Sequence, residues 1–85
     1  MFNMKARTEI NDALTCIVLA ETGLARSDYD GAAAAIHDAE CHYRSARSAV
    51  TIEKSDSILE NLSMLRIRLD RLQLAVNRKS AAVSA

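Results

Sequence analysis

The stretch ILENLSMLRIRLDRLQLAV, residues 58–76, decides the fold of this chain. Its large aliphatic side chains recur at alternating spacings of four and three residues, which places them on one face of a helix. The members of this stripe are Ile58, Leu62, Leu65, Leu69, Leu72 and Val76. Because neither glycine nor proline interrupts the stretch, the pattern predicts a long amphipathic helix that ends near Asn77.

Two more stripes with helical spacing lie upstream. Between Asp28 and Val50, alanines alternate with bulkier residues: Tyr29, Ala32, Ile36, Ala39, Tyr43, Ala46 and Val50. The alanines allow a neighbouring helix to approach closely, whereas the larger side chains fill the gaps between layers. From about Lys5 to Arg26, the first stripe consists of Ile10, Leu14, Ile17 and Leu24, widened by Ala6, Ala13, Val18 and Ala20. The chain therefore contains three predicted helices.

Polar residues mark where these helices begin and end. Ser27 and Asp30 have the S-x-x-D spacing of a capping box, in which the serine side chain accepts a hydrogen bond from the amide of Asp30. Gly23 lies just before this break, and we expect the first helix to fray or end there. The candidate N-caps of the other two helices are Asn3, Thr51 and Ser55. A tight turn at Ser27 predicts that the first two helices form an antiparallel hairpin.

The composition fits an all-α protein of one domain. The chain has 85 residues, no proline and two glycines, and 49% of its residues are apolar. We expect an up-down-up three-helix bundle over residues 1–79, with the third helix packed on the hairpin, and a disordered tail over residues 80–85. A chain of this length hides roughly 60–65% of its extended surface, so a partner or a second copy would add stability.

The charge is balanced, with 11 basic and 11 acidic residues. Nucleic-acid-binding proteins usually carry a basic excess, and this chain has none overall. Glu21 falls inside the first apolar stripe, and we expect it at the edge of the core or paired with an arginine of another helix. The apolar run 13–20 is too short to span a bilayer and has acidic neighbours. We therefore expect a cytoplasmic protein that does not bind membranes.

The sequence contains few groups with metal or thiol chemistry. We expect Cys16 and Cys41 to be buried free thiols. A single disulfide between their two helices is the alternative. His37 and Cys41 are four residues apart and share a helix face, which suits a transition metal. Two ligands do not make a structural zinc site, and Cys16 is the only plausible third. We therefore predict neither a metal nor a cofactor.

No catalytic residue is predicted. His42 lies four residues after Asp38 on the same helix face, so the Asp38 carboxylate could orient His42 as a general base. The sequence shows no nucleophile or substrate pocket beside this pair. We expect a surface Asp–His pair or a histidine between helices. Small dimeric helical enzymes such as the chorismate mutases, whose sites use basic side chains between helices, stay as an alternative. The candidate cations are Arg7, Arg44, Arg47, Arg66, Arg68 and Arg71.

Around the first break, Asp28 is followed by an aromatic, a small, a bulky and a small residue: Tyr29, Ala32, Ile36 and Ala39. In this order of residues, the hairpin over residues 10–43 resembles a single tetratricopeptide unit, a family that often has an acidic residue at the position of Asp28. The first helix departs from the pattern, because Gly23 occupies a position usually held by a large ring. The resemblance implies a helical hairpin used in protein–protein contact. It implies no site residues, because the matching positions are packing positions.

The last helix is more apolar than one core stripe requires. At 100° per residue, Ile67 and Leu74 lie about 160–180° from Ile58, on the opposite side. Arginines and a methionine surround them, and an apolar centre with an arginine-rich rim is typical of protein interfaces. The predicted partner-binding residues are Met64, Ile67, Arg71, Leu74 and Arg78.

The predicted function is that of a non-enzymatic protein–protein interaction module, such as an adaptor, a chaperone-like protein or an inhibitory regulator. Its partner would be a second copy, paired through the third helices, or a different protein. The alternative is a nucleic-acid-binding regulator that uses the basic C-terminal half of the third helix. The basic residues there are Arg66, Arg68, Arg71, Arg78 and Lys79. An acidic start and a basic end also complement the helix dipole, which accounts for the same pattern without a ligand.

Overall fold

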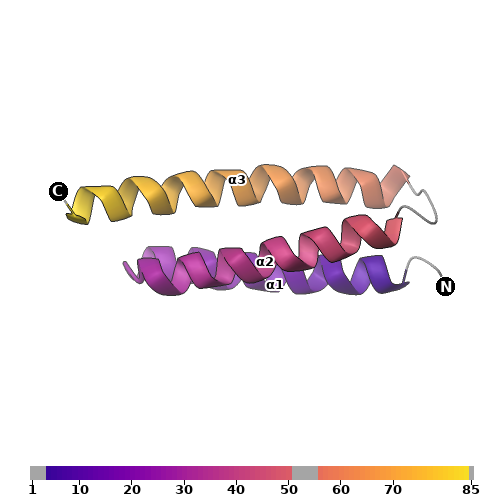
Figure 1. Ribbon diagram of the computed structural model, residues 1–85, viewed down its shortest axis with the longest axis horizontal. Helices are drawn as coiled ribbons and strands as arrows, with labels where there is room; N and C mark the ends of the chain where they lie inside the picture. Colours follow the sequence, from indigo (N-terminus) through magenta and orange to yellow (C-terminus); the bar gives the residue numbers. More distant parts are fainter. Residues whose placement is uncertain (1–3, 51–55, 85) are drawn as a thin grey trace.

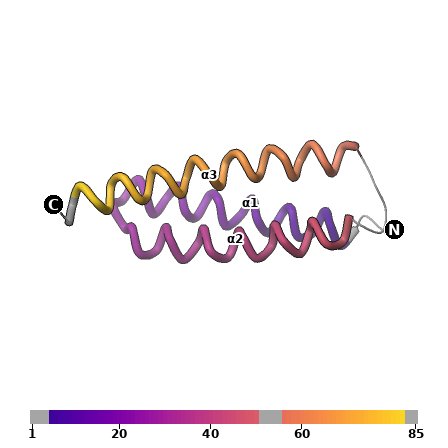
Figure 2. The backbone as a smooth tube through the Cα atoms, turned by 45° about the horizontal axis from the view of Figure 1, so that its top comes forward, coloured from indigo at the N-terminus to yellow at the C-terminus, as the bar shows by residue number. Residues whose placement is uncertain are grey.

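The computed structural model describes residues 4–50 and 56–84, and they form three helices (Figure 1). Helix α1 spans Met4–Ala25, α2 spans Tyr29–Val50 and α3 spans Asp56–Ser84. Consecutive helices run antiparallel, so α1 and α3 point in the same direction (Figures 1 and 2). The expected all-α, up-down-up bundle is confirmed. The proposed caps Asn3, Thr51 and Ser55 lie outside the described residues.

The turn between α1 and α2 is built differently from the predicted capping box. Ser27 has a φ of 61°, and its amide donates to the carbonyl of Leu24 at 3.1 Å. The amide of Asp28 donates to the carbonyl of Gly23 at 2.8 Å. These two bonds around a left-handed residue form a Schellman motif, which closes the C-terminus of α1. Ser27 therefore ends α1 instead of capping α2.

Asp28 takes over the N-cap of α2. Its Oδ1 accepts a hydrogen bond from the amide of Gly31 at 3.0 Å, and its carbonyl accepts the first helical bond of α2, from Ala32 at 2.9 Å. Gly23 does not end α1, which continues to Ala25. A side chain at Gly23 would place a Cβ only 3.2 Å from the backbone nitrogen of Ala32 and the backbone oxygen of Asp28. The glycine thus allows the two helices to meet closely at the turn.

Alanines fill the interface between α1 and α2. Each helix places a buried alanine at every seventh residue, and the two sets are Ala6, Ala13 and Ala20 in α1, and Ala32, Ala39 and Ala46 in α2. Because these side chains are so short, the two backbones can approach closely. Accordingly, α1 and α2 form the most extensive contact in the bundle. The hairpin is one tightly packed layer.

Helix α3 packs on this hairpin through its large aliphatic stripe. All six predicted members, Ile58, Leu62, Leu65, Leu69, Leu72 and Val76, are buried. They form one buried cluster with residues of the hairpin, including Ile17 and Ile36. Val18 was expected to widen the α1 stripe, but its side chain is 55% exposed. It lies one residue beyond Ile17, and the 100° step turns it away from the core.

The C-terminal end of α3 differs from expectation. The helix continues to Ser84, so the predicted end at Asn77 and the predicted disordered tail over residues 80–85 are wrong for all but the final residue, which is not described. No glycine or proline ends the helix, and the alanines there favour helix strongly. With 29 residues against 22 in each hairpin helix, α3 projects beyond the α1–α2 turn (Figure 1).

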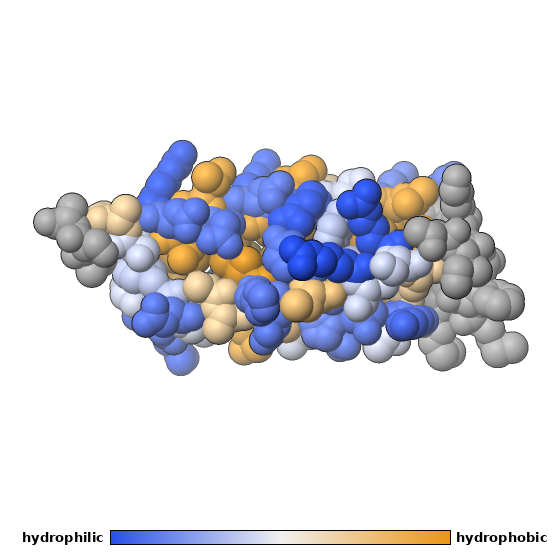
Figure 3. Space-filling model, viewed as in Figure 1, coloured by the Kyte–Doolittle hydropathy of each residue, from blue (hydrophilic) through white to orange (hydrophobic). Residues whose placement is uncertain are grey.

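The surface combines charged and apolar side chains. In Figure 3, apolar side chains reach the surface between charged ones along α3, at the top of the view. Among the described residues, no helix has both the length and the apolar character that a membrane span requires.

Candidate functional site

The predicted partner-binding face of α3 is not covered by the rest of the chain. The side chains of Met64, Ile67 and Leu74 are 59%, 46% and 54% exposed. Arg71 and Arg78 are exposed beside them. These residues lie on the opposite side of α3 from the buried leucines, as the 100° rotation per residue requires. All five predicted residues therefore share one accessible face of one helix.

This face repeats the spacing of the buried one. It consists of Glu60, Met64, Ile67, Arg71, Leu74 and Arg78, and we call it the outer seam. The spacings alternate between four and three residues, as in the seam of a coiled coil. Glu60 is exposed and belongs to this series, although it was not among the predicted site residues. Its position four residues before Met64 is the signal that would have included it.

The distribution of exposed apolar residues makes α3 the candidate site. The large apolar side chains that the described residues expose are Val18, Leu19, Leu59, Met64, Ile67 and Leu74. Four of them lie on α3, and three of those belong to the outer seam. Beside the seam lies an open hollow of about 580 Å³, whose lining includes Leu59, Glu60 and Met64. Half of these exposed apolar side chains thus lie on one side of α3.

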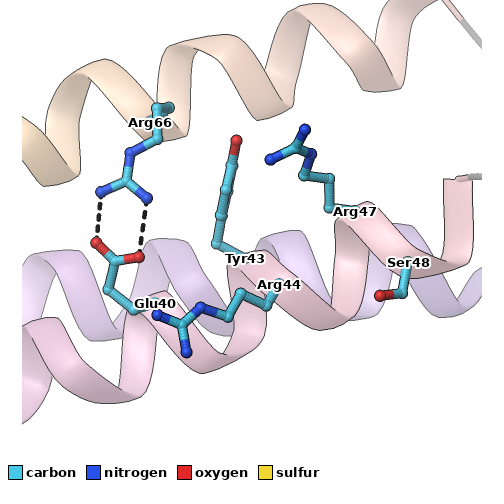
Figure 4. A pocket seen from close by; sticks show the side chains of 6 residues that line it. All are labelled: Glu40, Tyr43, Arg44, Arg47, Ser48 and Arg66. Carbon is cyan, nitrogen blue, oxygen red and sulfur yellow. Dashed lines mark hydrogen bonds and ion pairs between the residues drawn. The ribbon is translucent and has the colours of Figure 1, made fainter.

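Arg66, which flanks the core stripe of α3, is held by acidic side chains. Its guanidinium donates two hydrogen bonds to the carboxylate of Glu40 on α2, and one of them is 2.8 Å long (Figure 4). It also donates to Asp70 at 2.8 and 3.1 Å and lies 5.1 Å from the centre of the Tyr43 ring. The bonds from Arg66 lower the pKa of Glu40, and the bonds to Glu40 and Asp70 raise the pKa of Arg66.

Arg68 is held on the other flank of α3. Its Nη2 donates to Oε1 of Glu21 at 3.3 Å, which confirms that Glu21 pairs with an arginine of a neighbouring helix. Arg66 and Arg68 therefore contact the hairpin. Arg71 and Arg78 form no ion pair with any residue in the described ranges, and the same holds for Lys79. The free cations of α3 lie toward its C-terminal end.

A groove of about 500 Å³ lies between α2 and α3 (Figure 4). It is lined by some of the arginines that were candidates for the site of a helical enzyme. Its lining residues are Glu40, Tyr43, Arg44, Arg47, Ser48 and Arg66. Three of the cations proposed for an enzyme site line it, whereas Arg7, Arg68 and Arg71 do not. An anion in this groove would also meet the Glu40 carboxylate, which lowers the positive potential there.

His42 pairs with α1 and not with Asp38. Its Nδ1 lies 2.6 Å from Oε2 of Glu9, because the side chain turns across the hairpin interface. The donor atoms of Glu9, Asp12 and His42 lie within 4.8 Å of one another. Among the described residues, these three form the group whose ligand atoms are close enough to bind one metal ion. The hydrogen bond between Glu9 and His42 accounts for this proximity without a metal.

The cysteines are free, as expected, but they are not both buried. Cys41 is exposed, and its Sγ lies 4.0 Å from Nε2 of His37, which confirms that these two residues share a face. Cys41 follows the buried Ala39 by two residues, and a 200° rotation turns it outward. Cys16 is half-buried, and burial raises the pKa of its thiol, with smaller contributions from Asp38 and Asp12.

Comparisons with known protein families, with curated proteins and with solved structures found no match.

Proposed function

We propose that this chain is a protein–protein interaction module without enzymatic activity, and that it binds its partner through the outer seam of α3. The exposure of Ile67 and Leu74 on a helix whose opposite face is fully packed carries this proposal. Fully burying an aliphatic side chain of this size is worth roughly 1.5–3 kcal/mol. A partner that covers the half-exposed Met64, Ile67 and Leu74 would recover a substantial part of that free energy.

The arginines of the seam support the same function. Arg71 and Arg78 have no ion-pair partner among the described residues, so they are available to another chain. Arginine and methionine are enriched in protein interfaces, and arginine is frequent among the residues whose truncation costs most binding energy. Such a module would act as an adaptor, a chaperone-like protein or an inhibitory regulator.

The nucleic-acid alternative has less support. It relied on five basic residues of α3, and two of them, Arg66 and Arg68, form ion pairs with residues of the hairpin. Phosphate binding depends on cations that can exchange their counterions for phosphate groups, and a cation already paired with a carboxylate contributes less. We therefore favour the protein-binding function.

Photo-crosslinking in the native host tests the function. A photoreactive amino acid placed at Ile67 should yield covalent adducts with protein chains, whether copies of this chain or another protein. The matched control is the same amino acid at Ala33, an exposed position of α2 outside the outer seam. Adducts at Ile67 that the control lacks would support the proposal. Equal labelling at the two positions would overturn it.

A further inference from the structure

We propose that the partner of the outer seam is a second copy of this chain, whose α3 lies antiparallel to the first. This inference rests on the proposed function, because it names the occupant of the same face. The order of charges along the seam carries it. The seam has an acidic residue, Glu60, at its N-terminal end and arginines, Arg71 and Arg78, toward its C-terminal end.

The spacing of the outer seam is the same when it is read in either direction. It runs four, three, four, three and four residues from Glu60 to Arg78. A second seam can therefore pair with it antiparallel, position for position. Glu60 would then face the partner's Arg78, Met64 would face the partner's Leu74, and Ile67 would face the partner's Arg71. Because the pair is symmetric, each of these contacts occurs twice.

Each of the three contacts is chemically complementary. Glu60 and Arg78 are both exposed and of opposite charge, so they would form an ion pair at each end of the interface. Met64 and Leu74, more than half exposed in the single chain, would cover each other. Ile67 would pack on the aliphatic stem of Arg71, whose guanidinium stays in water. The apolar contacts thus lie between two charged ends.

A parallel arrangement lacks this complementarity. In register, it would place Arg71 against Arg71, Arg78 against Arg78 and Glu60 against Glu60. Like charges in contact destabilise a pair of helices, whereas opposite charges across the seam set the orientation of the two chains. The same sequence therefore favours the antiparallel pair over the parallel one.

The residues beside the seam are compatible with this pairing. Asp70 lies near the midpoint, where two copies of it would approach each other, but Arg66 of its own chain holds its carboxylate. The seam from Glu60 to Arg78 is about 27 Å long at 1.5 Å per residue. This length corresponds to five helical turns, which suits a specific contact between two helices. The hairpins would lie on the outside of a six-helix assembly.

Disulfide trapping tests the orientation. In a background with Cys16→Ala and Cys41→Ser, the variants Met64→Cys and Leu74→Cys are prepared separately and then mixed under oxidising conditions. The antiparallel pair predicts a disulfide between the two variants. Neither variant alone should crosslink, because the two copies of residue 64 would lie about 15 Å apart along the helix axes. Bridged cysteines need Cα atoms within about 7 Å.

Charge exchange tests the register. Sedimentation equilibrium would measure the dissociation constant of the dimer for Arg78→Glu, Glu60→Arg and the double variant. Each single change should raise the constant about tenfold, because two ion pairs become repulsive contacts. The double variant should return to within about threefold of the original chain. Lys79→Glu makes the same charge change one residue outside the seam, and we expect it to alter the constant by less than about threefold.

Each other outcome contradicts a defined part of the proposal. A disulfide in Met64→Cys alone, or no recovery in the double variant, would overturn the antiparallel register. A monomer at every concentration would overturn self-pairing. In that case, adducts with a different protein at Ile67 would preserve the proposed function. Absence of any adduct would remove the function as well.

Discussion

At the scale of single residues, Arg66 shows how one side chain connects two helices. Its guanidinium forms ion pairs with Glu40 on α2 and with Asp70 on its own helix. It also lies over the Tyr43 ring. Both acidic partners are wholly or partly accessible to water, so the ion pair with Glu40 contributes a modest free energy, on the order of 1 kcal/mol. It connects α3 to α2 beside the buried apolar stripe that packs α3 on the hairpin.

The pH dependence of stability should report this pair. Arg66 lowers the pKa of Glu40 in the folded chain, so Glu40 binds its proton more readily when the chain is unfolded. The stabilisation is therefore complete above the unfolded value of about 4.3 and is lost as the pH falls through the lower folded value. We expect Glu40→Gln to cost about 1 kcal/mol of unfolding free energy at pH 7 and much less at pH 3.

Urea unfolding at the two pH values measures this difference. Asp38→Asn is a suitable control, because Asp38 is exposed in the middle of the same helix and forms no ion pair among the described residues. The same Glu40→Gln cost at both pH values would show that the ion pair does not stabilise the fold.

At the scale of elements, the ends of the helices follow from local backbone rules. The letters S-x-x-D suggested a capping box, and the structure instead places Ser27 in the left-handed conformation that ends α1. One residue can satisfy only one of these roles, because an N-cap has extended backbone angles. Asp28 then caps α2 and the turn becomes very short. Because the turn is short, α1 and α2 pack against each other directly from the turn onward.

Substitution of Ser27 should reveal which role it has. A left-handed conformation costs a non-glycine residue about 1 kcal/mol, and glycine avoids this cost. We therefore expect Ser27→Gly to raise the free energy of unfolding by about 0.5–1 kcal/mol, and Ser27→Ala to change it by less than about 0.5 kcal/mol. Asp28→Ala should lower it by about 1 kcal/mol. Thermal and urea unfolding measure all three.

The opposite pattern would restore the capping box. If Ser27→Ala lost about 1 kcal/mol while Asp28→Ala had no effect, the serine would be the N-cap of α2.

At the scale of the whole molecule, the three helices pack in two different ways. The α1–α2 interface is lined with alanines, and α3 covers it with leucines. Small side chains allow two backbones to approach closely, whereas the larger side chains of α3 fill the space between α3 and the hairpin. This arrangement leaves the far side of α3 free, and the outer seam lies there.

Enlarging an alanine of the hairpin should test this packing. Ala39 is fully buried, so Ala39→Leu would force α1 and α2 apart and cost about 1–3 kcal/mol of unfolding free energy. Ala33→Leu adds the same atoms at an exposed position of the same helix and should change stability by less than about 0.5 kcal/mol. Chemical unfolding compares the two. Equal effects would mean that the interface does not need small residues.

Much of the candidate site could be predicted from the sequence, because helical rotation is a local property. Once Ile58 is known to face the core, a step of 100° per residue places Ile67 and Leu74 on the far side. Glu60 is not among the predicted partner-binding residues, and its negative charge also suits the start of a helix. Its place in the outer seam depends only on spacing, so the sequence contained that signal too.

The sequence by itself determined the three helices, their buried stripes and the exposed face of α3, since periodicity acts within one helix. Only the tertiary structure decided which charges are paired between helices. Arg66 and Arg68 contact Glu40 and Glu21 because the rotation and distance of neighbouring helices bring them together. Residues far apart in the chain meet through packing, which no local spacing encodes.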